Sequence, residues 1–182
     1  MAERTTYVLV DGENLDATLG TSVLGRRPQP DERPRWAKLL THAEERWQQP
    51  AKGLFFLAVG EDLPLSFVQA LLAMGYTPVP LTGPGKVVDI AIRRTATALV
   101  DRDADVMLVS HDGDFAPQME QLAEDEDRRV GVVGFPEFVA GSLRQVPGVE
   151  IIDLEHDART FTSPLPRVRV IPIEEFDPLE FL

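Results

Sequence analysis

Three short acidic stretches carry the residue types that could do chemistry, and they lie where apolar, strand-like runs stop. They are Val-Asp-Gly-Glu-Asn at 10–14, Lys-Val-Val-Asp at 86–89 and Ser-His-Asp-Gly-Asp-Phe at 110–115. In an open α/β sheet, ligands bind at the carboxyl ends of the strands. Carboxylates gathered there repel one another unless a cation lies between them, and an oxygen-rich, sulfur-free set suits Mg²⁺ or Mn²⁺. The sequence therefore predicts a divalent metal site.

Each of these residues also has a simpler structural explanation when it is taken alone. Asp11 precedes a glycine and could form only a turn, and Asn14 could cap a helix. Asp89 opens a predicted helix, and either Asp112 or Asp114 could cap the next one. Capping does not require both of the last two, because one carboxylate satisfies the available amide groups. A cation bound between the strand ends explains the whole set, and we prefer it for that reason.

Other residues with chemical potential are assigned plainer roles. His111 could act as a general base, because histidine ordinarily titrates near neutral pH, but a lone histidine in such a loop is more often solvent-facing. Ser110 lacks the Gly-x-Ser-x-Gly setting of a nucleophile elbow. Lys86 follows a glycine but precedes Val, which excludes a P-loop, so it either contacts a phosphate or is simply solvated. Trp36 and Trp47 lie on one predicted helix, which favours core packing over base stacking.

The composition describes an ordinary globular chain and excludes several kinds of chemistry. With 182 residues, 43% of them hydrophobic, the chain is long enough for one domain with a substantial core. It has no cysteine, so disulfides, thiolate zinc sites and cysteine nucleophiles are excluded. The N-terminus lacks the layout of a signal peptide, and the apolar run at 54–59 is too short to span a bilayer. We therefore expect a cytoplasmic protein with no membrane partner.

The net charge of −12 bears on nucleic-acid binding. A sequence-independent binder of nucleic acid normally has a basic surface, and the overall charge argues against one. Metal-dependent phosphodiesterases nevertheless have acidic sites, because bound cations reverse the local charge. Positive charge is also clustered in this chain, at Arg26, Arg27, Arg33 and Arg35 and again at Arg93 and Arg94. A local basic groove is therefore compatible with the sequence.

Strand-like and helical segments alternate along almost the whole chain, which predicts a parallel sheet covered by helices on both faces. Strands are expected at 5–10, 52–59, 77–81, 105–109, 129–134 and 150–153, with two prolines placing 77–81 at a sheet edge. Helices are expected near 13–19, 35–48, 64–74, 88–101, 115–124 and 137–143. Residues 20–34, rich in glycine, proline and charge, are expected to form a long exposed loop.

The character of the sequence changes after about residue 157. Four prolines interrupt the segment, including its apolar, strand-like stretch at 168–173. We expect an extended, non-helical tail that packs along the domain surface or against a second copy of the chain. The predicted organisation is therefore an α/β domain at 1–156 and a proline-rich tail at 157–182.

In their order and spacing, the three acidic stretches resemble the signature of the NYN domain. This family of PIN-like nucleases includes the LabA-like bacterial proteins, and the similarity covers about residues 5–155. It implies a three-layer, Rossmann-like α/β fold with a central parallel sheet and an acidic pocket at the strand ends. It also implies one or two divalent cations, Mg²⁺ or Mn²⁺, with Asn14 and Ser110 in support of the metal ligands Asp11, Asp89, Asp112 and Asp114.

The chain departs from the family pattern at two positions. Many members have glycine where this sequence has Val87, and some have a further aspartate where it has Thr95. Loss of that aspartate weakens the case for a second, tightly held cation.

Two functions from different classes follow, and a third, a phosphatase, is disfavoured because the Asp-x-Asp at 112–114 comes too late in the chain. The first is a metal-dependent ribonuclease with Asp11, Asp89, Asp112, Asp114 and Asn14 as its catalytic residues. Its RNA, single-stranded or structured, would contact Ser110, Lys86, Arg26, Arg27, Arg93 and Arg94. The second is a catalytically weak or inactive RNA- or protein-binding module, which the net charge and Thr95 favour. The presence of all four aspartates makes us prefer the nuclease.

Overall fold

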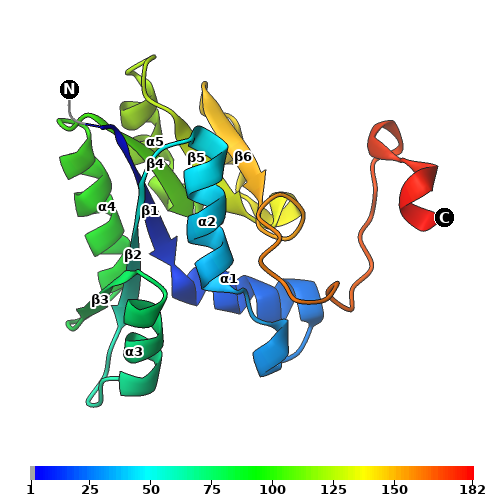
Figure 1. Ribbon diagram of the computed structural model, residues 1–182, viewed down its shortest axis with the longest axis horizontal. Helices are drawn as coiled ribbons and strands as arrows, with labels where there is room; N and C mark the ends of the chain where they lie inside the picture. The colour runs from blue at the N-terminus through cyan, green and yellow to red at the C-terminus, as the bar shows by residue number, and fades with distance from the viewer. Residues whose placement is uncertain (1–2) are drawn as a thin grey trace.

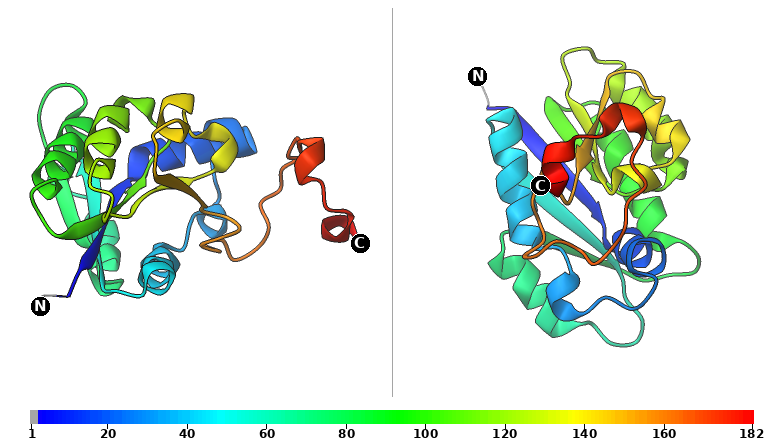
Figure 2. Two further views of the ribbon diagram at one scale, coloured as in Figure 1. Left: turned by 90° about the horizontal axis from the view of Figure 1, so that it is seen from above. Right: turned by 90° about the vertical axis from the view of Figure 1, so that its right-hand side faces the viewer.

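A computed structural model describes residues 3–182 and has three layers, with a β-sheet between two layers of helices (Figures 1 and 2). Six strands form the sheet in the order β3-β2-β1-β4-β5-β6, and every neighbouring pair is parallel. The strands are β1 (Thr5–Asp11), β2 (Ala51–Ala58), β3 (Thr77–Leu81), β4 (Ala104–Val109), β5 (Val130–Gly134) and β6 (Val149–Asp153). The predicted fold class is confirmed, and the proline-containing β3 lies at an edge as expected.

Six α-helices cover the sheet. They are α1 (Gly12–Thr18), α2 (Trp36–Trp47), α3 (Leu65–Ala73), α4 (Val87–Leu99), α5 (Ala116–Ala123) and α6 (Gly141–Arg144). Helices α1, α2 and α3 supply buried side chains to the core on one face, and α4, α5 and α6 supply those on the other. Among residues 3–182, no helix is both long enough and apolar enough to cross a membrane.

The two cores arise from the alternation of side chains along the central strands. Val8 and Val10 of β1 face the α2 side, whereas Leu9 faces the α4 side. All six residues of β4 are buried, which is the pattern of a strand covered on both faces.

The strand order brings two of the acidic stretches together. From β1 the chain passes outward through β2 to β3, and it then crosses back to β4 on the other side of β1. At such a reversal a crevice opens beyond the carboxyl ends of the two central strands. Asp11 ends β1 and Ser110 directly follows β4, so the first and third acidic stretches lie side by side at this crevice.

The prediction of an exposed loop at 20–34 is partly wrong. Residues Leu19–Leu24 continue α1 as a π-helical turn, and Pro30–Glu32 form a 3₁₀ turn. Leu19 and Val23 are four residues apart, so both point into the core, where they are 1% and 8% exposed. This packing overrides the local preference of the neighbouring glycines and polar residues for a loop.

The single short helix expected at 137–143 is instead divided in two. A 3₁₀ turn at Pro136–Phe138 and the four-residue α6 are separated by Val139 and Ala140, and the backbone of Val139 is extended. The Val139 side chain is 5% exposed, and the extended backbone lets it reach the core beneath α5 and α6.

The C-terminal tail has two parts with different environments. Up to Arg167 it lies against the α2 side of the domain, where Ala158 and Leu165 are buried and the Arg35 N–H donates to the Thr160 carbonyl at 2.6 Å. Residues 168–182 stand away from the domain (Figures 1 and 2), and Val168 is 96% exposed. This second part contains 3₁₀ turns at Ile173–Glu175 and Pro178–Phe181 but no strand, so the expected surface packing holds only for the first part.

Candidate functional site

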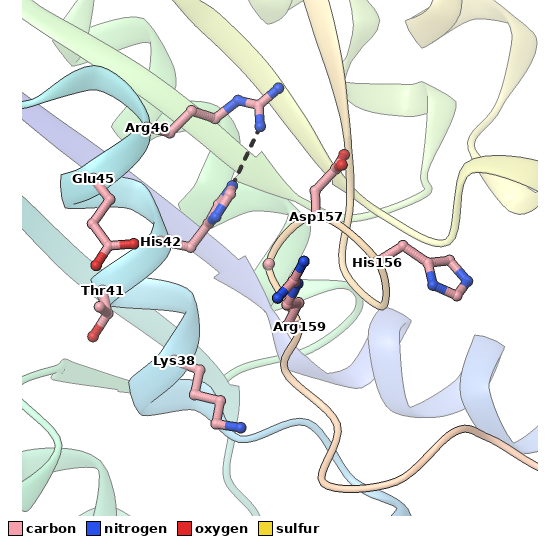
Figure 3. Close-up of a pocket in the computed structure, with 9 residues that line it drawn as sticks. Lys38, Thr41, His42, Glu45, Arg46, His156, Asp157 and Arg159 are labelled. Atoms are coloured by element: carbon pink, nitrogen blue, oxygen red, sulfur yellow. Dashed lines mark hydrogen bonds between the residues drawn. The ribbon is translucent and has the colours of Figure 1, made fainter.

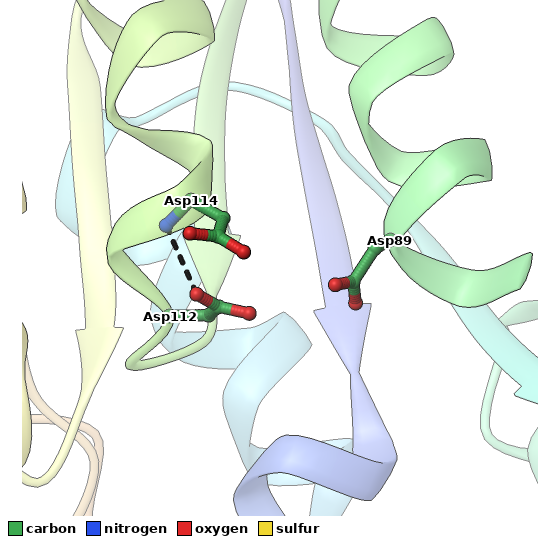
Figure 4. Close-up of side chains that lie close together, drawn as sticks. All are labelled: Asp89, Asp112 and Asp114. Atoms are coloured by element: carbon green, nitrogen blue, oxygen red, sulfur yellow. Dashed lines mark hydrogen bonds between the residues drawn. The ribbon is translucent and has the colours of Figure 1, made fainter. Parts of the chain in front are cut away.

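Three carboxylates converge at the crevice between β1 and β4. Asp112 and Asp114 follow β4, and Asp89 lies in the first turn of α4 and points toward them across the end of β1 (Figure 4). One oxygen from each of the three lies within 4.8 Å of the others. The second acidic stretch is thus brought to the other two by the first turn of α4.

Asp11 lies beside this cluster and is almost fully buried, at 3% exposure. Its Oδ2 accepts a hydrogen bond from the Ser110 hydroxyl at 3.0 Å, and its Oδ1 accepts one from the Asn14 N–H at 3.4 Å. Burial raises the pKa of Asp11 to about 6, although these two hydrogen bonds oppose the shift. Repulsion from Asp89 and Asp112 raises it further.

Two of the four aspartates cap a helix or a turn, and the other two do not. Asp112 caps the 3₁₀ turn Gly113–Phe115, accepting from the Asp114 N–H at 2.9 Å, and Asp11 caps α1. Asp114 caps nothing, and Asp89 is three residues inside α4, whose N-cap position is held by Lys86. Burial and the nearby Asp112 raise the pKa of Asp89. Capping therefore leaves two of the four aspartates without an explanation.

His111 is buried rather than solvent-facing, contrary to the expectation, with 5% of its surface exposed. Its Nε2 accepts from the Phe135 N–H at 2.9 Å, so the ring proton lies on Nδ1, which donates to Asn14 Oδ1 at 2.9 Å. Burial lowers the pKa of His111 to about 4, so the ring is neutral at pH 7. The His111 N–H also donates to Asn14 Oδ1 at 2.9 Å. Asn14 is therefore held by His111 rather than capping α1, and only its amide nitrogen is left to contact a ligand.

The residues predicted to contact the substrate differ in exposure and in their distance from the acidic cluster. Lys86 is exposed at the rim of the acidic pocket, and Arg93, one turn after Asp89, lies 3.6 Å from Asp114 Oδ2. Arg94 is exposed on α4, and Ser110 is fully buried behind Asp11. Ser110 also accepts from the Asp112 N–H at 3.2 Å, which makes it a support for the aspartates.

The two adjacent arginines at 26 and 27 differ in their pairing. Both terminal nitrogens of the Arg26 guanidinium, Nη1 and Nη2, donate to Glu32, each at 2.7 Å, and this pairing lowers the pKa of Glu32 to about 2. Arg27 is exposed, and it lies with Arg33 along the shallow hollow that borders the 28–30 turn.

Two hollows open beside each other at the strand ends. The acidic pocket, about 330 Å³, is lined by Asp11, Asn14, Lys86, Asp89 and Asp112. A neighbouring hollow of about 310 Å³ is mostly apolar and contains the rings of Trp36, Phe55 and Phe67. Glu13 and Ala58 line both. Trp36, expected in the core, borders this hollow, whereas Trp47 is buried as predicted.

A third hollow, of about 580 Å³, lies between α2 and the 156–159 loop (Figure 3). It shares no lining residue with the acidic pocket. His42 and Arg46, which line it, are 3.5 Å apart, and Arg46 also pairs with Glu150. Its lining mixes basic Lys38 and Arg159 with acidic Glu45 and Asp157, so its charges largely compensate one another.

Comparisons with known proteins agree with this geometry. The sequence profile of the NYN domain matches residues 5–155. No curated protein matches the chain in sequence. A solved structure of a protein of unknown function from Vibrio parahaemolyticus has the same fold, with a TM-score of 0.68 and 17% identity over 85% of this chain and 95% of that one. Because the family match spans most of the chain and includes the whole acidic cluster, the chain belongs to the NYN domain family of PIN-like nucleases.

Proposed function

We propose that the protein is a metal-dependent ribonuclease whose catalytic unit is residues 1–156. The observation that carries the proposal is the convergence of Asp89, Asp112 and Asp114 beside the buried Asp11, at the strand ends where the fold opens a crevice. Repulsion raises the energy of such a cluster in the absence of a cation, and capping accounts for only two of its members. Membership of the NYN family supports the same conclusion.

The donor set fits Mg²⁺ or Mn²⁺. All the side-chain donors are oxygens, and opposite oxygens around Mg²⁺ are about 4.2 Å apart. The mutual 4.8 Å limit among Asp89, Asp112 and Asp114 is close to that span, so small side-chain movements would complete a site. Asp11, held by Ser110 and the Asn14 N–H, would be a further ligand from the buried side. A divalent cation bound there supplies water activation and charge neutralisation at a phosphodiester.

The protein residues around the cation have separate tasks in this proposal. Lys86, which is exposed and lines the acidic pocket, would contact a phosphate of the RNA. Arg93 pairs with Asp114 and would be released for a phosphate once a cation compensates that carboxylate. His111 keeps the Asn14 side chain fixed. The direct test is Mn²⁺-dependent cleavage of labelled single-stranded RNA by the purified protein.

A non-catalytic RNA-binding module is the second candidate. The Arg93–Asp114 pair compensates part of the negative charge of the cluster, and Thr95 donates to the Ala91 carbonyl instead of offering a carboxylate. A protein that binds RNA and Mn²⁺ but cuts no RNA would have this second function.

Millimolar Mn²⁺ is expected to raise the melting temperature of the wild-type protein, because a cation that binds only the folded state stabilises it by mass action. At one hundred times the dissociation constant the gain is about 2.7 kcal/mol. Asp112→Asn removes one ligand but keeps the cap, since Asn caps a helix about as well as Asp. Thermal unfolding with and without Mn²⁺ should therefore show a smaller shift for this variant, and equal shifts would rule out the metal site.

Arg27→Gln is expected to weaken RNA binding. The slope of the logarithm of the binding constant against the logarithm of the salt concentration should also become shallower by about 0.7, the value for one phosphate contact on a single strand. Arg26→Gln is the matched control, because Glu32 already neutralises Arg26 and little counterion release depends on it. Both are measured by fluorescence anisotropy over a range of KCl, in an Asp114→Asn background that prevents cleavage. The same slope in both variants would show that Arg27 makes no phosphate contact.

A further inference from the structure

The apolar hollow next to the acidic pocket is built around three aromatic rings from three elements. Trp36 and Phe67 each meet the ring of Phe55 edge-on, with centroids 5.2 and 5.4 Å away. Phe55 is 2% exposed and forms the floor, whereas Phe67 is 38% exposed at the mouth. An apolar pocket with an exposed aromatic ring at its edge can hold a flat, apolar-faced ligand.

The hollow and the acidic pocket are two parts of one surface. Glu13 and Ala58 line both, and Gly12 lies between Asp11 and the ring of Phe55. A Cβ on Gly12 would lie 2.6 Å from that ring, so glycine is what allows the aromatic floor to approach the aspartate loop so closely. A ligand bound at the aspartates would therefore place the part of the molecule next to its bound group against the aromatic rings.

The rim of the hollow carries polar groups on the side away from the aspartates. Arg33 and Asp16, 3.4 Å apart, both line it, and Arg33 also borders the next hollow together with Arg27. The order along the surface is thus carboxylates, aromatic rings and arginines. This order matches one nucleotide of a single nucleic-acid strand, in which a flat base projects from the sugar that joins one phosphate to the next.

We propose that the hollow is a nucleobase subsite, which takes one unpaired base of a single-stranded RNA next to the phosphate held at the aspartates. The proposal rests on the proposed ribonuclease function and names its substrate class. A base can enter only when it is not stacked in a duplex, so the subsite selects single strands over double strands. Stacking on aromatic side chains tolerates any base, and specificity for one base is not required.

Phe67→Ala tests the subsite, because Phe67 lies at the mouth and is partly exposed, so the fold should tolerate its loss. Leu72→Ala is the matched control, since Leu72 is 57% exposed on the same helix and does not line the hollow. Binding is measured by anisotropy, in the Asp114→Asn background, with a single-stranded RNA, the same RNA containing one abasic position, and an RNA duplex. We expect Phe67→Ala to weaken binding of the single-stranded RNA about tenfold. The variant should also lose the preference of the wild-type protein for the intact RNA over the RNA with one abasic position. Leu72→Ala should leave both unchanged.

The outcomes separate this proposal from the ribonuclease itself. Tight single-strand binding that is indifferent to Phe67→Ala and to the abasic position would overturn the subsite, even if wild-type protein cleaves RNA. Binding that depends on Phe67 and on the base, with no cleavage by wild-type protein, would keep the subsite and overturn the ribonuclease. A peptide of residues 168–182 that displaces the RNA from wild-type protein but not from Phe67→Ala would support the location of the subsite. The same peptide binding at Phe67 in a protein that binds no RNA would overturn the subsite in favour of an apolar peptide.

Discussion

Asp11→Asn and Asp114→Asn are each expected to lower Mn²⁺-dependent cleavage of single-stranded RNA at least about a thousandfold. Both substitutions keep the shape of the side chain and remove its charge. Water activation and charge compensation by a cation are worth several kcal/mol, and they are lost when a ligand is neutralised. A capping role for Asp11 would survive the change, because Asn caps helices about as well as Asp.

The control for this experiment is Asp101→Asn. Asp101 is exposed just beyond the C-terminal end of α4, the helix whose first turn holds Asp89, so it tests loss of charge without loss of a ligand. Initial rates of cleavage of a 5′-labelled RNA, with circular dichroism to check the fold, distinguish the cases. Wild-type rates in both Asp11→Asn and Asp114→Asn would show that the cluster is not catalytic.

The fold was predictable because its signals are local. β4 is buried along its whole length and ends in four consecutive apolar residues, Val106–Val109, which is the pattern of a buried parallel strand. Asp11-Gly12 ends β1 with a turn signal. The 20–34 segment was not predictable in the same way. Its glycines, prolines and charges describe a loop, and only the four-residue spacing of Leu19 and Val23 indicates that one side packs inward.

The membership of the site was partly predictable and its internal geometry was not. Parallel strands end at the same sheet edge, so Asp11 and Asp112 had to be neighbours once β1 and β4 were adjacent. The burial of His111 depends on the Phe135 N–H, which is 24 residues away at the end of β5. Side-chain spacing places Trp36 on the apolar face of α2, but it cannot show whether a ring lies inside the core or at the mouth of a hollow.

Asp11→Asn is expected to have a second large effect, on stability in the absence of a cation. The pKa of Asp11 is about 6 in the folded protein, against an ordinary value of 3.8 in the unfolded chain, so the folded state binds the proton more tightly. Stability therefore falls as the pH rises through this window, and above pH 6 the loss is about 3 kcal/mol. Asn does not titrate, so the variant avoids this loss and its amide can still pair with Ser110.

The expected result is a variant that is about as stable as wild type near pH 4 and more stable, by up to about 3 kcal/mol, at pH 7 in EDTA. Urea unfolding of both proteins at the two pH values gives their free energies of unfolding. In the difference between the two proteins, the contributions of the carboxylates that both contain cancel. Saturating Mn²⁺ at pH 7 should reverse the order, because the cation stabilises only the protein that keeps its full ligand set. A difference that is the same at both pH values would mean that Asp11 ionises as it does in water, and that its burial does not strain the cation-free site.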